Sequence, residues 1–449
     1  MEERLRRRNN NVIKKLQIRE ISSMPHRAFA AATAFHRFRS MRLTQEYETL
    51  DDPFKTQSTL LPFLMKRTRV SEIIAAKNVV FVRFHSGLCS AFSRETNERI
   101  CILNLSPDEA IHSLFYNKNN DSLISVSGYG SENFGTLKCR STKIEYLRMG
   151  KADAGFPLLQ SESLKWPGYI EFNAANGKIL THSAHDSVYK VFDLKDYTML
   201  YSISDRHVKE IKICPGVMLL ISYRVCDHIP LLIVSIEDGT VLKVFNHILQ
   251  SNKVVLIESC NEKLLVKQEN KNLQILDVPK AELMEVNTAA FRSPSSFIFL
   301  YQSQLFLAIR NHTISVWNFR GELVTAFDDH QLWHAGYKTN DTHIIIDQDL
   351  IISYCKAYPD DQRMEGKDAG SINVSNILDG TCVAKIDARS SSIKAKECSS
   401  SSFCEHSHSF IVSSVTEALE DITALTYDED RNEIYTGNRY GLVHVWSNS

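Results

Sequence analysis

The apolar and polar positions from Ile422 to Trp446 (ITALTYDEDRNEIYTGNRYGLVHVW) alternate in a way that predicts three short strands. Val443 and Val445 alternate with His444 before the tryptophan, and two polar turns divide the segment into three apolar runs. A sheet of three strands leaves an unpaired edge that has to be covered. The pattern therefore predicts a β-meander that takes a fourth strand from another part of the chain.

The same order of apolar runs and turns recurs upstream at a period of roughly 35 to 45 residues, which is the spacing of propeller blades. Helical periodicity is nearly absent after residue 70. The repeat-like units cover about residues 70–105, 111–164, 170–203, 208–245, 253–286, 297–327, 343–386 and 422–446. We therefore predict an all-β propeller of eight blades. Seven blades are the alternative, because the weak unit at 111–164 could absorb an irregular insertion.

Closure of the ring is expected to use the segment Ser58 to Met65 (STLLPFLM) as the missing outer strand. The segment is apolar and lies just before the first full unit, and Pro62 restricts it to a sheet edge. Removal of residues 1–66 should then destabilise the fold, whereas removal of residues 1–50 should not.

The beginning of the chain differs from the rest in charge. Eleven Lys or Arg residues stand against a single acid within residues 4–42, although the formal net charge of the whole chain is -1. The cluster that includes Arg6, Arg7 and Arg8 suits a solvated tail, nuclear import, contact with an acidic protein or contact with RNA or DNA. These arginines are therefore candidates for binding a partner.

The predicted domain organisation is a basic arm at residues 1–57, partly helical or disordered, and a propeller at residues 58–449. Residues 28–38 are amphipathic enough to form a short helix that could dock on a partner or on the propeller. A Ser-rich loop is expected as an insertion at about 388–420, where it could be phosphorylated.

The composition argues against a secreted or membrane-spanning protein. The chain is 43% hydrophobic, yet no uninterrupted apolar run approaches the roughly 18 to 20 residues that a bilayer-spanning helix needs. Its 10 cysteines lie at no framework spacing, which suits reduced thiols. We therefore expect a nuclear and/or cytoplasmic protein that does not act at a membrane.

The sequence contains no recognisable catalytic motif, since the phosphate loop, His-Glu-x-x-His and Gly-x-Ser-x-Gly patterns are all missing. One cluster has metal-ligand types close together, namely Cys398, Cys404, His406 and His408. Its Cys-x5-Cys-x-His-x-His spacing is unusual for zinc, because alternate residues of an extended chain point to opposite sides. We therefore predict a protein that is not an enzyme and that needs no cofactor.

Three residue pairs recur near the ends of the predicted third strands, namely Phe192-Asp193, Trp317-Asn318 and Trp446-Ser447, and the triplets Asp205-Arg206-His207 and Asp328-Asp329-His330 stand where a new blade opens. With these motifs the chain resembles the WD-repeat (transducin β-like) family over about residues 58–446. The pairs stand in place of the family's Trp-Asp dipeptide and the triplets in place of its Gly-His dipeptide. Asp186 matches the family's structural aspartate, which the resemblance places in the tight turn between the second and third strands of a blade.

The resemblance also carries a narrower functional implication. Members with Arg or Lys two residues after the Trp-Asp pair are substrate receptors of cullin-RING ubiquitin ligases, which dock on an adaptor protein. The residues that match this pattern are Asp186, Asp193 and Lys195 in the third unit, and Trp317, Asn318 and Arg320 in the sixth. Lys195 and Arg320 could equally be ordinary exposed turn residues.

These observations favour a scaffold whose surfaces hold other proteins or peptides. A receptor of a cullin-RING ligase, bound to its adaptor, is the first alternative. A propeller enzyme is the second, and it would need several carboxylates or histidines that converge at the central channel. Nucleic acid is expected as a partner only through the basic arm.

Overall fold

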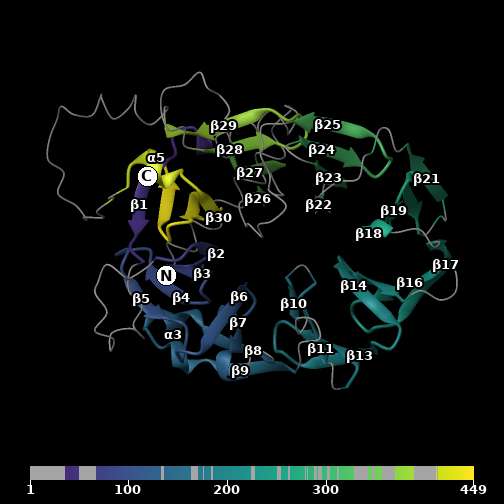
Figure 1. The fold of residues 1–449 in the computed structure, drawn as a ribbon, viewed down its shortest axis with the longest axis horizontal. Coiled ribbons are helices and arrows are strands. Elements are labelled where there is room, and N and C mark those ends of the chain that lie inside the picture. Colours follow the sequence, from purple (N-terminus) through teal and green to yellow (C-terminus); the bar gives the residue numbers. More distant parts are fainter. Residues whose placement is uncertain are drawn as a thin grey trace, which may run out of the picture.

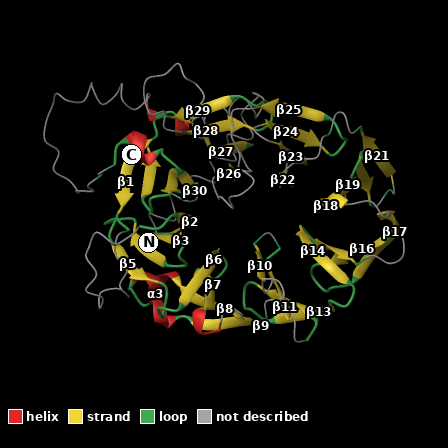
Figure 2. Ribbon diagram, in the orientation of Figure 1, coloured by secondary structure: helices red, strands yellow, loops and turns green. Residues whose placement is uncertain are grey.

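The computed structural model of the chain shows antiparallel sheets that follow one another in a ring (Figure 1). Strands dominate, and short helical turns occur at a few connections (Figure 2). The structure describes residues 36–49, 67–132, 136–162, 170–174, 176–183, 186–223, 228–249, 254–260, 263–278, 280, 282–287, 291, 296–300, 304–310, 313–327, 342–345, 349–355, 370–388, 411 and 413–448.

The described strands form eight four-stranded sheets, which confirms the prediction of an eight-bladed propeller. We number the blades in chain order. Blade one contains β2 (Val70–Ala76), β3 (Val79–Phe84), β4 (Cys89–Ser93) and β5 (Arg99–Ile102), and blade two contains β6 (Glu109–Asn117), β7 (Ser122–Tyr129), β8 (Thr136–Lys143) and β9 (Phe156–Glu162). Blade three contains β10 (Ile170–Asn173), β11 (Lys178–Ser183), β12 (Val188–Asp193) and β13 (Met199–Ser204). Blade four contains β14 (Val208–Cys214), β15 (Val217–Ser222), β16 (Ile229–Ser235) and β17 (Val241–Leu249).

Blades five to seven continue the same meander. Blade five contains β18 (Val254–Cys260), β19 (Lys263–Gln268), β20 (Leu273–Asp277) and β21 (Glu282–Val286). Blade six contains β22 (Ser296–Leu300), β23 (Leu305–Arg310), β24 (Thr313–Asn318) and β25 (Leu323–Phe327). Blade seven contains β26 (Thr342–Ile345), β27 (Leu350–Cys355), β28 (Ser371–Asn376) and β29 (Cys382–Ile386). Blade eight contains β30 (Ile422–Asp428), β31 (Glu433–Asn438), β32 (Val443–Ser447) and β1 (Arg42–Tyr47).

The position of a strand within its blade explains its amino-acid pattern. The first strand lies toward the centre of the ring and the fourth at the outer rim (Figure 1). Neighbouring blades cover both faces of the middle strands, so β27 and β28 are buried at every position. Outer strands are half-covered, and β13 has no buried position. The second strand β27 therefore appears in the sequence as an apolar run (LIISYC), whereas the third strand β28 (SINVSN) also buries Ser and Asn side chains.

The predicted closing strand is wrong. The outer edge of blade eight is occupied by β1, whose Leu43 and Tyr47 lie opposite Trp446 and Val443 of β32. The prediction favoured the most apolar nearby segment, although an outer strand is only partly buried and β1 (RLTQEY) accordingly carries just two apolar residues among polar ones. Ser58 to Met65 lies outside the described residues. The strand at 42–47, which we assigned to the arm, is part of the propeller sheet.

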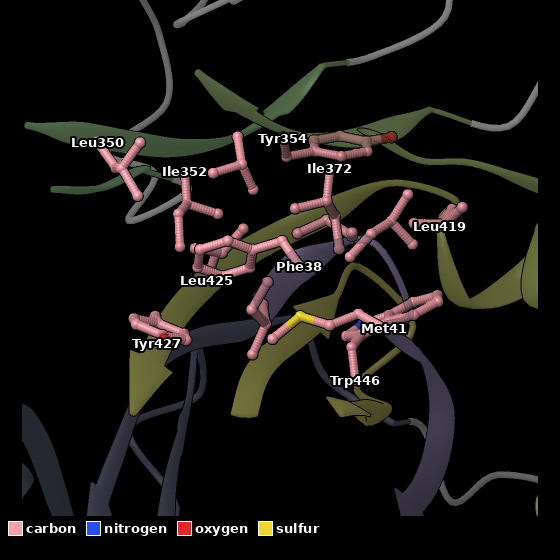
Figure 3. Packing of buried hydrophobic residues seen from close by; sticks show 14 of the residues in the cluster. Phe38, Met41, Leu350, Ile352, Tyr354, Ile372, Leu419, Leu425, Tyr427 and Trp446 are labelled. Carbon is pink, nitrogen blue, oxygen red and sulfur yellow. The ribbon is translucent and has the colours of Figure 1, made fainter. Parts of the chain in front are cut away.

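A hydrophobic cluster between blades seven and eight anchors the entry to β1 (Figure 3). Of the predicted helix at residues 28–38, residues 36–38 are described, and they are helical. Phe38 is buried, and its ring centroid lies 5.4 Å from that of Tyr427. Met41 is buried in the same cluster together with Ile352 and Trp446. This end of the predicted helix therefore docks on the propeller.

The Ser-rich insertion returns to the same cluster at its end. A short helix, α5 (Val415–Ala418), begins with a capping box in which the Ser414 hydroxyl accepts from the Glu417 amide. Ala418 and Leu419 are buried against blades seven and eight. The last part of the predicted loop is thus packed on the ring.

Arg94, which follows β4, joins the first blade to the last. Its guanidinium donates to Tyr435 Oη at 2.8 Å, to Asp428 Oδ2 at 2.5 Å and to Glu433 Oε2 at 2.8 Å. It also donates to the carbonyl oxygen of Lys77 at 2.6 Å. The Arg94 side chain is only 2% exposed, so these bonds replace its lost hydration. Burial raises the pKa of the Tyr435 hydroxyl, which therefore stays protonated.

Truncation tests the observed closure. Removal of residues 1–50 deletes β1 and Phe38, and we expect it to lower the melting temperature by about 5 °C or more because the edge of β32 and an apolar cluster become exposed. Removal of residues 1–35 keeps both and is the control. Equal melting temperatures of the two truncated proteins in differential scanning calorimetry would contradict closure by β1.

Substitution of Arg94 tests the link between the first and last blades. Arg94→Ala leaves two half-buried carboxylates without their cation, and we expect the free energy of unfolding to fall by about 3 to 5 kcal/mol. Lys77→Ala removes the exposed ion pair with Asp121 and should change it by less than about 1 kcal/mol. Urea denaturation measures both values. Similar small losses in the two variants would show that the Arg94 contacts do not hold the ring.

Candidate functional site

The turns between the third and fourth strands carry the residues that the WD-repeat resemblance selected. Asp193 Oδ1 accepts from the backbone N–H of Lys195 at 2.7 Å in blade three. Asn318 Oδ1 accepts from the backbone N–H groups of Arg320 and Glu322 at 2.9 Å and 3.0 Å in blade six. An amide oxygen serves this turn as well as a carboxylate does. The replacement of Asp by Asn therefore preserves the turn.

Lys195 and Arg320 are exposed and belong to blades that are not neighbours. Blades four and five lie between them in the ring, so the structure does not bring the two cations together (Figure 1). Each can contact a partner from its own turn. A single compact site that uses both is excluded by this placement.

The tryptophans at the ends of β24 and β32 are buried but differ in their hydrogen bonds. Trp446 Nε1 donates to Thr436 Oγ1 at 2.9 Å. Trp317 Nε1 is buried and has no hydrogen-bond partner among the described residues. Trp446 pairs with Ile434 and Trp317 with Phe306, so the residue equivalent to Thr436 in blade six is Ala308. The missing hydroxyl at Ala308 explains the unpaired indole.

Two aspartates of blade three make side-chain contacts, and Asp186 lies in the turn between β11 and β12, where the resemblance places it. The Asp186 carboxylate accepts from Ser183 Oγ at 3.0 Å and pairs with Lys190 Nζ at 2.7 Å on an exposed turn. Asp205 Oδ2 lies 2.9 Å from Nε2 of His182, which links the turn before β14 to β11. His182 was not a candidate from the sequence. The resemblance places a histidine in the turn that opens a blade, as in Asp205-Arg206-His207, whereas His182 lies on strand β11.

Phe192 lies on β12 beside these residues. It is partly buried and packs against the cluster that contains Ile179 and Leu194 between blades two and three. Its position opposite Ile179 in the sheet is the one that Trp317 occupies opposite Phe306. Phe192 therefore fills the aromatic position of the repeat, as predicted.

Several charged side chains on the inner strands form ion pairs. Glu72 Oε2 of β2 lies 2.9 Å from Arg83 Nε, and burial raises the pKa of Glu72. Lys212 of β14 lies 3.5 Å from Glu210 and also pairs with Glu258 of β18 in the next blade. The pair of Lys212 with Glu258 ties blade four to blade five.

A histidine also lies on an inner strand. Burial and the nearby Arg83 lower the pKa of His112 on β6, so its imidazole is neutral at pH 7. No group of three His, Cys, Asp or Glu residues that could hold a metal ion occurs among the described residues.

Two sets of predicted site residues lie outside the described residues. One is the basic cluster Arg6, Arg7 and Arg8. The other is the metal-ligand cluster Cys398, Cys404, His406 and His408.

Among the residues that the structure describes, no helix is long and apolar enough to cross a membrane.

These features define the chain as an eight-bladed β-propeller with ion pairs on its inner strands. Residues 26–446 match the family model described as Domain of unknown function (DUF7899), and the chain belongs to that family. No curated protein matches the chain.

Solved structures show similar folds. The computationally designed Ika8 protein is 15% identical with a TM-score of 0.49, and the match covers 85% of this chain and 96% of that one. Raptor from Chaetomium thermophilum is 11% identical with a TM-score of 0.47, over 93% of this chain and 30% of that one. BamB from Moraxella catarrhalis is 11% identical with a TM-score of 0.43, over 84% and 94%. These likenesses concern the fold and not the function.

The unpaired indole of blade six predicts a stabilising substitution. Ala308→Thr places a hydroxyl where Thr436 meets Trp446, and we expect it to raise the free energy of unfolding by about 1 kcal/mol. Ala308→Val is the matched control, because valine has the same shape without the hydroxyl. Thermal and urea denaturation measure both variants. An equal gain with valine would assign the effect to packing.

Proposed function

We propose that this propeller is a scaffold of the WD-repeat type that binds other proteins or peptides and has no catalytic role. The hydrogen bond between Trp446 and Thr436 and the shared turn geometry of Asp193 and Asn318 support repeats of that type. The observation that carries the binding role is a series of exposed apolar residue pairs on the outer strands of blades three to six. Exposed apolar groups that recur on one rim are typical of interaction surfaces.

The proposed scaffold acts in the nucleus and/or the cytoplasm and needs no cofactor. The basic cluster at Arg6, Arg7 and Arg8 supports nuclear import or contact with an acidic partner. Contact with nucleic acid, where it occurs, uses this arm. The paired charges of the inner strands support a structural role for the ring.

A second candidate function is that of a substrate receptor of a cullin-RING ubiquitin ligase. The observation that favours it is the exposure of both Lys195 and Arg320, each two residues after the turn-forming residue of its blade. Because the two turns belong to separate blades, an adaptor would use one of them or span blades four and five.

Affinity purification of the tagged full chain from cells, with quantitative mass spectrometry, tests both functions. A scaffold should retain at least two partners above a tag-only control. The Lys195→Ala, Arg320→Ala double variant should lose a cullin adaptor only if the receptor function is right. Arg439→Ala, an exposed cation on the turn between β31 and β32 of blade eight, is the control. Recovery of no partner at all would refute the scaffold.

A further inference from the structure

The outer strands of four consecutive blades expose two adjacent apolar side chains at their beginning. The exposed fractions reach 55% for Met199, 57% for Leu242, 55% for Leu283 and 53% for Leu323. The pairs are Met199-Leu200, Val241-Leu242, Leu283-Met284 and Leu323-Val324. Isolated exposed apolar residues are common, but a pair repeated in four blades forms a band along the rim.

The pairs occupy equivalent positions of their sheets. The first member of each lies opposite the end of the third strand, where blade six has Trp317 opposite Leu323 and blade three has Phe192 opposite Met199. In blade five the same position is held by Leu283 opposite Leu276. The four pairs therefore lie at one height on the rim of the ring.

Close packing of the turns makes the band continuous between blades five and six. Gly321, at φ +74°, begins the outer hairpin of blade six, and an added Cβ would lie 2.4 Å from Val286 Cγ2 and 3.6 Å from Met284 Sδ. Glycine is needed here for both its φ and its lack of a side chain. The exposed pair of blade five thus adjoins the turn that leads into Leu323.

Blade one shows how this position is covered when it is not exposed. Its second outer-strand residue, Ile100, and the following Cys101 pack against the short helix α3 (Ile144–Arg148). The helix contributes Ile144 and Leu147, which are buried and spaced three residues apart. The apolar side of a helix is therefore an element that fits the beginning of an outer strand.

The hairpins that carry the band are acidic. Residues 193–201, 235–245, 277–286 and 318–327 contain eight carboxylates and four Lys or Arg residues. Glu282 and Glu285 flank Leu283 and Met284 and are exposed. Hydrogen bonds from Gln274 and Asn272 lower the pKa of Glu285, which stays ionised at neutral pH. A partner that matches this rim carries Lys or Arg beside its apolar side.

We propose that the outer strands of blades five and six dock a basic amphipathic helix of a partner protein. The helix lays its apolar stripe on Met284 and Leu323, which lie on the facing sides of the two blades because their sheet partners Ile275 and Trp317 share one buried cluster. Its cations face Glu282 and Glu322. This proposal rests on the scaffold function and specifies the chemistry of a partner. It assigns the binding surface to the side of the ring.

A model peptide tests the surface on the full chain. The probe is a fluorescent 14-residue peptide of Leu and Lys with leucines at helical spacing, and its affinity is measured by fluorescence anisotropy. We expect the Met284→Ser, Leu323→Ser double variant to bind at least tenfold more weakly. Leu105→Ser, at a residue 46% exposed beside Asp108 and Glu109 on the far side of the ring, should change the affinity less than twofold.

Several outcomes would overturn the proposal. They are no binding by the full chain, equal binding of a scrambled peptide of the same composition, or unchanged binding by the double variant. Unaltered melting temperature of the double variant, expected because Met284 and Leu323 are both exposed, excludes unfolding as the cause of a loss. Partners that co-purify equally well with the double variant would reject this surface but leave the scaffold function standing.

Discussion

The joint between the first and last blades is the constraint on which the whole ring depends. Each blade buries its faces on two neighbours, so an open ring would leave two apolar faces in water. Two contacts from distant parts of the chain close it, the β1–β32 pairing and the Arg94 hydrogen bonds. The strand supplies the hydrogen bonds of the sheet edge. The guanidinium satisfies carboxylates that would otherwise be half-buried without a cation.

A regular ring arises from irregular repeats because local turn chemistry is kept while the motif residues vary. Asn318 and Asn376 accept backbone N–H groups in blades six and seven as Asp193 does in blade three. Gly239 packs against Tyr201 of the preceding blade as Gly380 packs against Phe327. Small polar residues and glycines thus fix the outer hairpins. The tryptophan position tolerates replacement, since its main contribution is buried apolar volume.

The sequence predicted the number and limits of the blades because buried middle strands give strong apolar runs, as in LIISYC of β27. It failed on the closing strand, because β1 is half-exposed and its polar residues hide it among those of the basic arm. The pair of His182 with Asp205 was also missed, since it depends on a contact between a strand and a turn. Exposure of Leu283 and Leu323 could not be predicted either, because apolar residues in a strand are normally buried.

Pairing of β1 with β32 also determines when the ring can close during synthesis. Thr44 contacts the carbonyl of Val445, which is separated from it by 401 residues of chain. At bacterial and eukaryotic translation rates of about 5 to 20 residues per second, β1 waits roughly 20 to 80 s on the ribosome before β32 is made. During that time its edge is open and the earlier blades can already stack on one another. The nascent propeller therefore exposes an unpaired strand throughout its translation, and such an open edge is prone to pair with other chains until β32 is made.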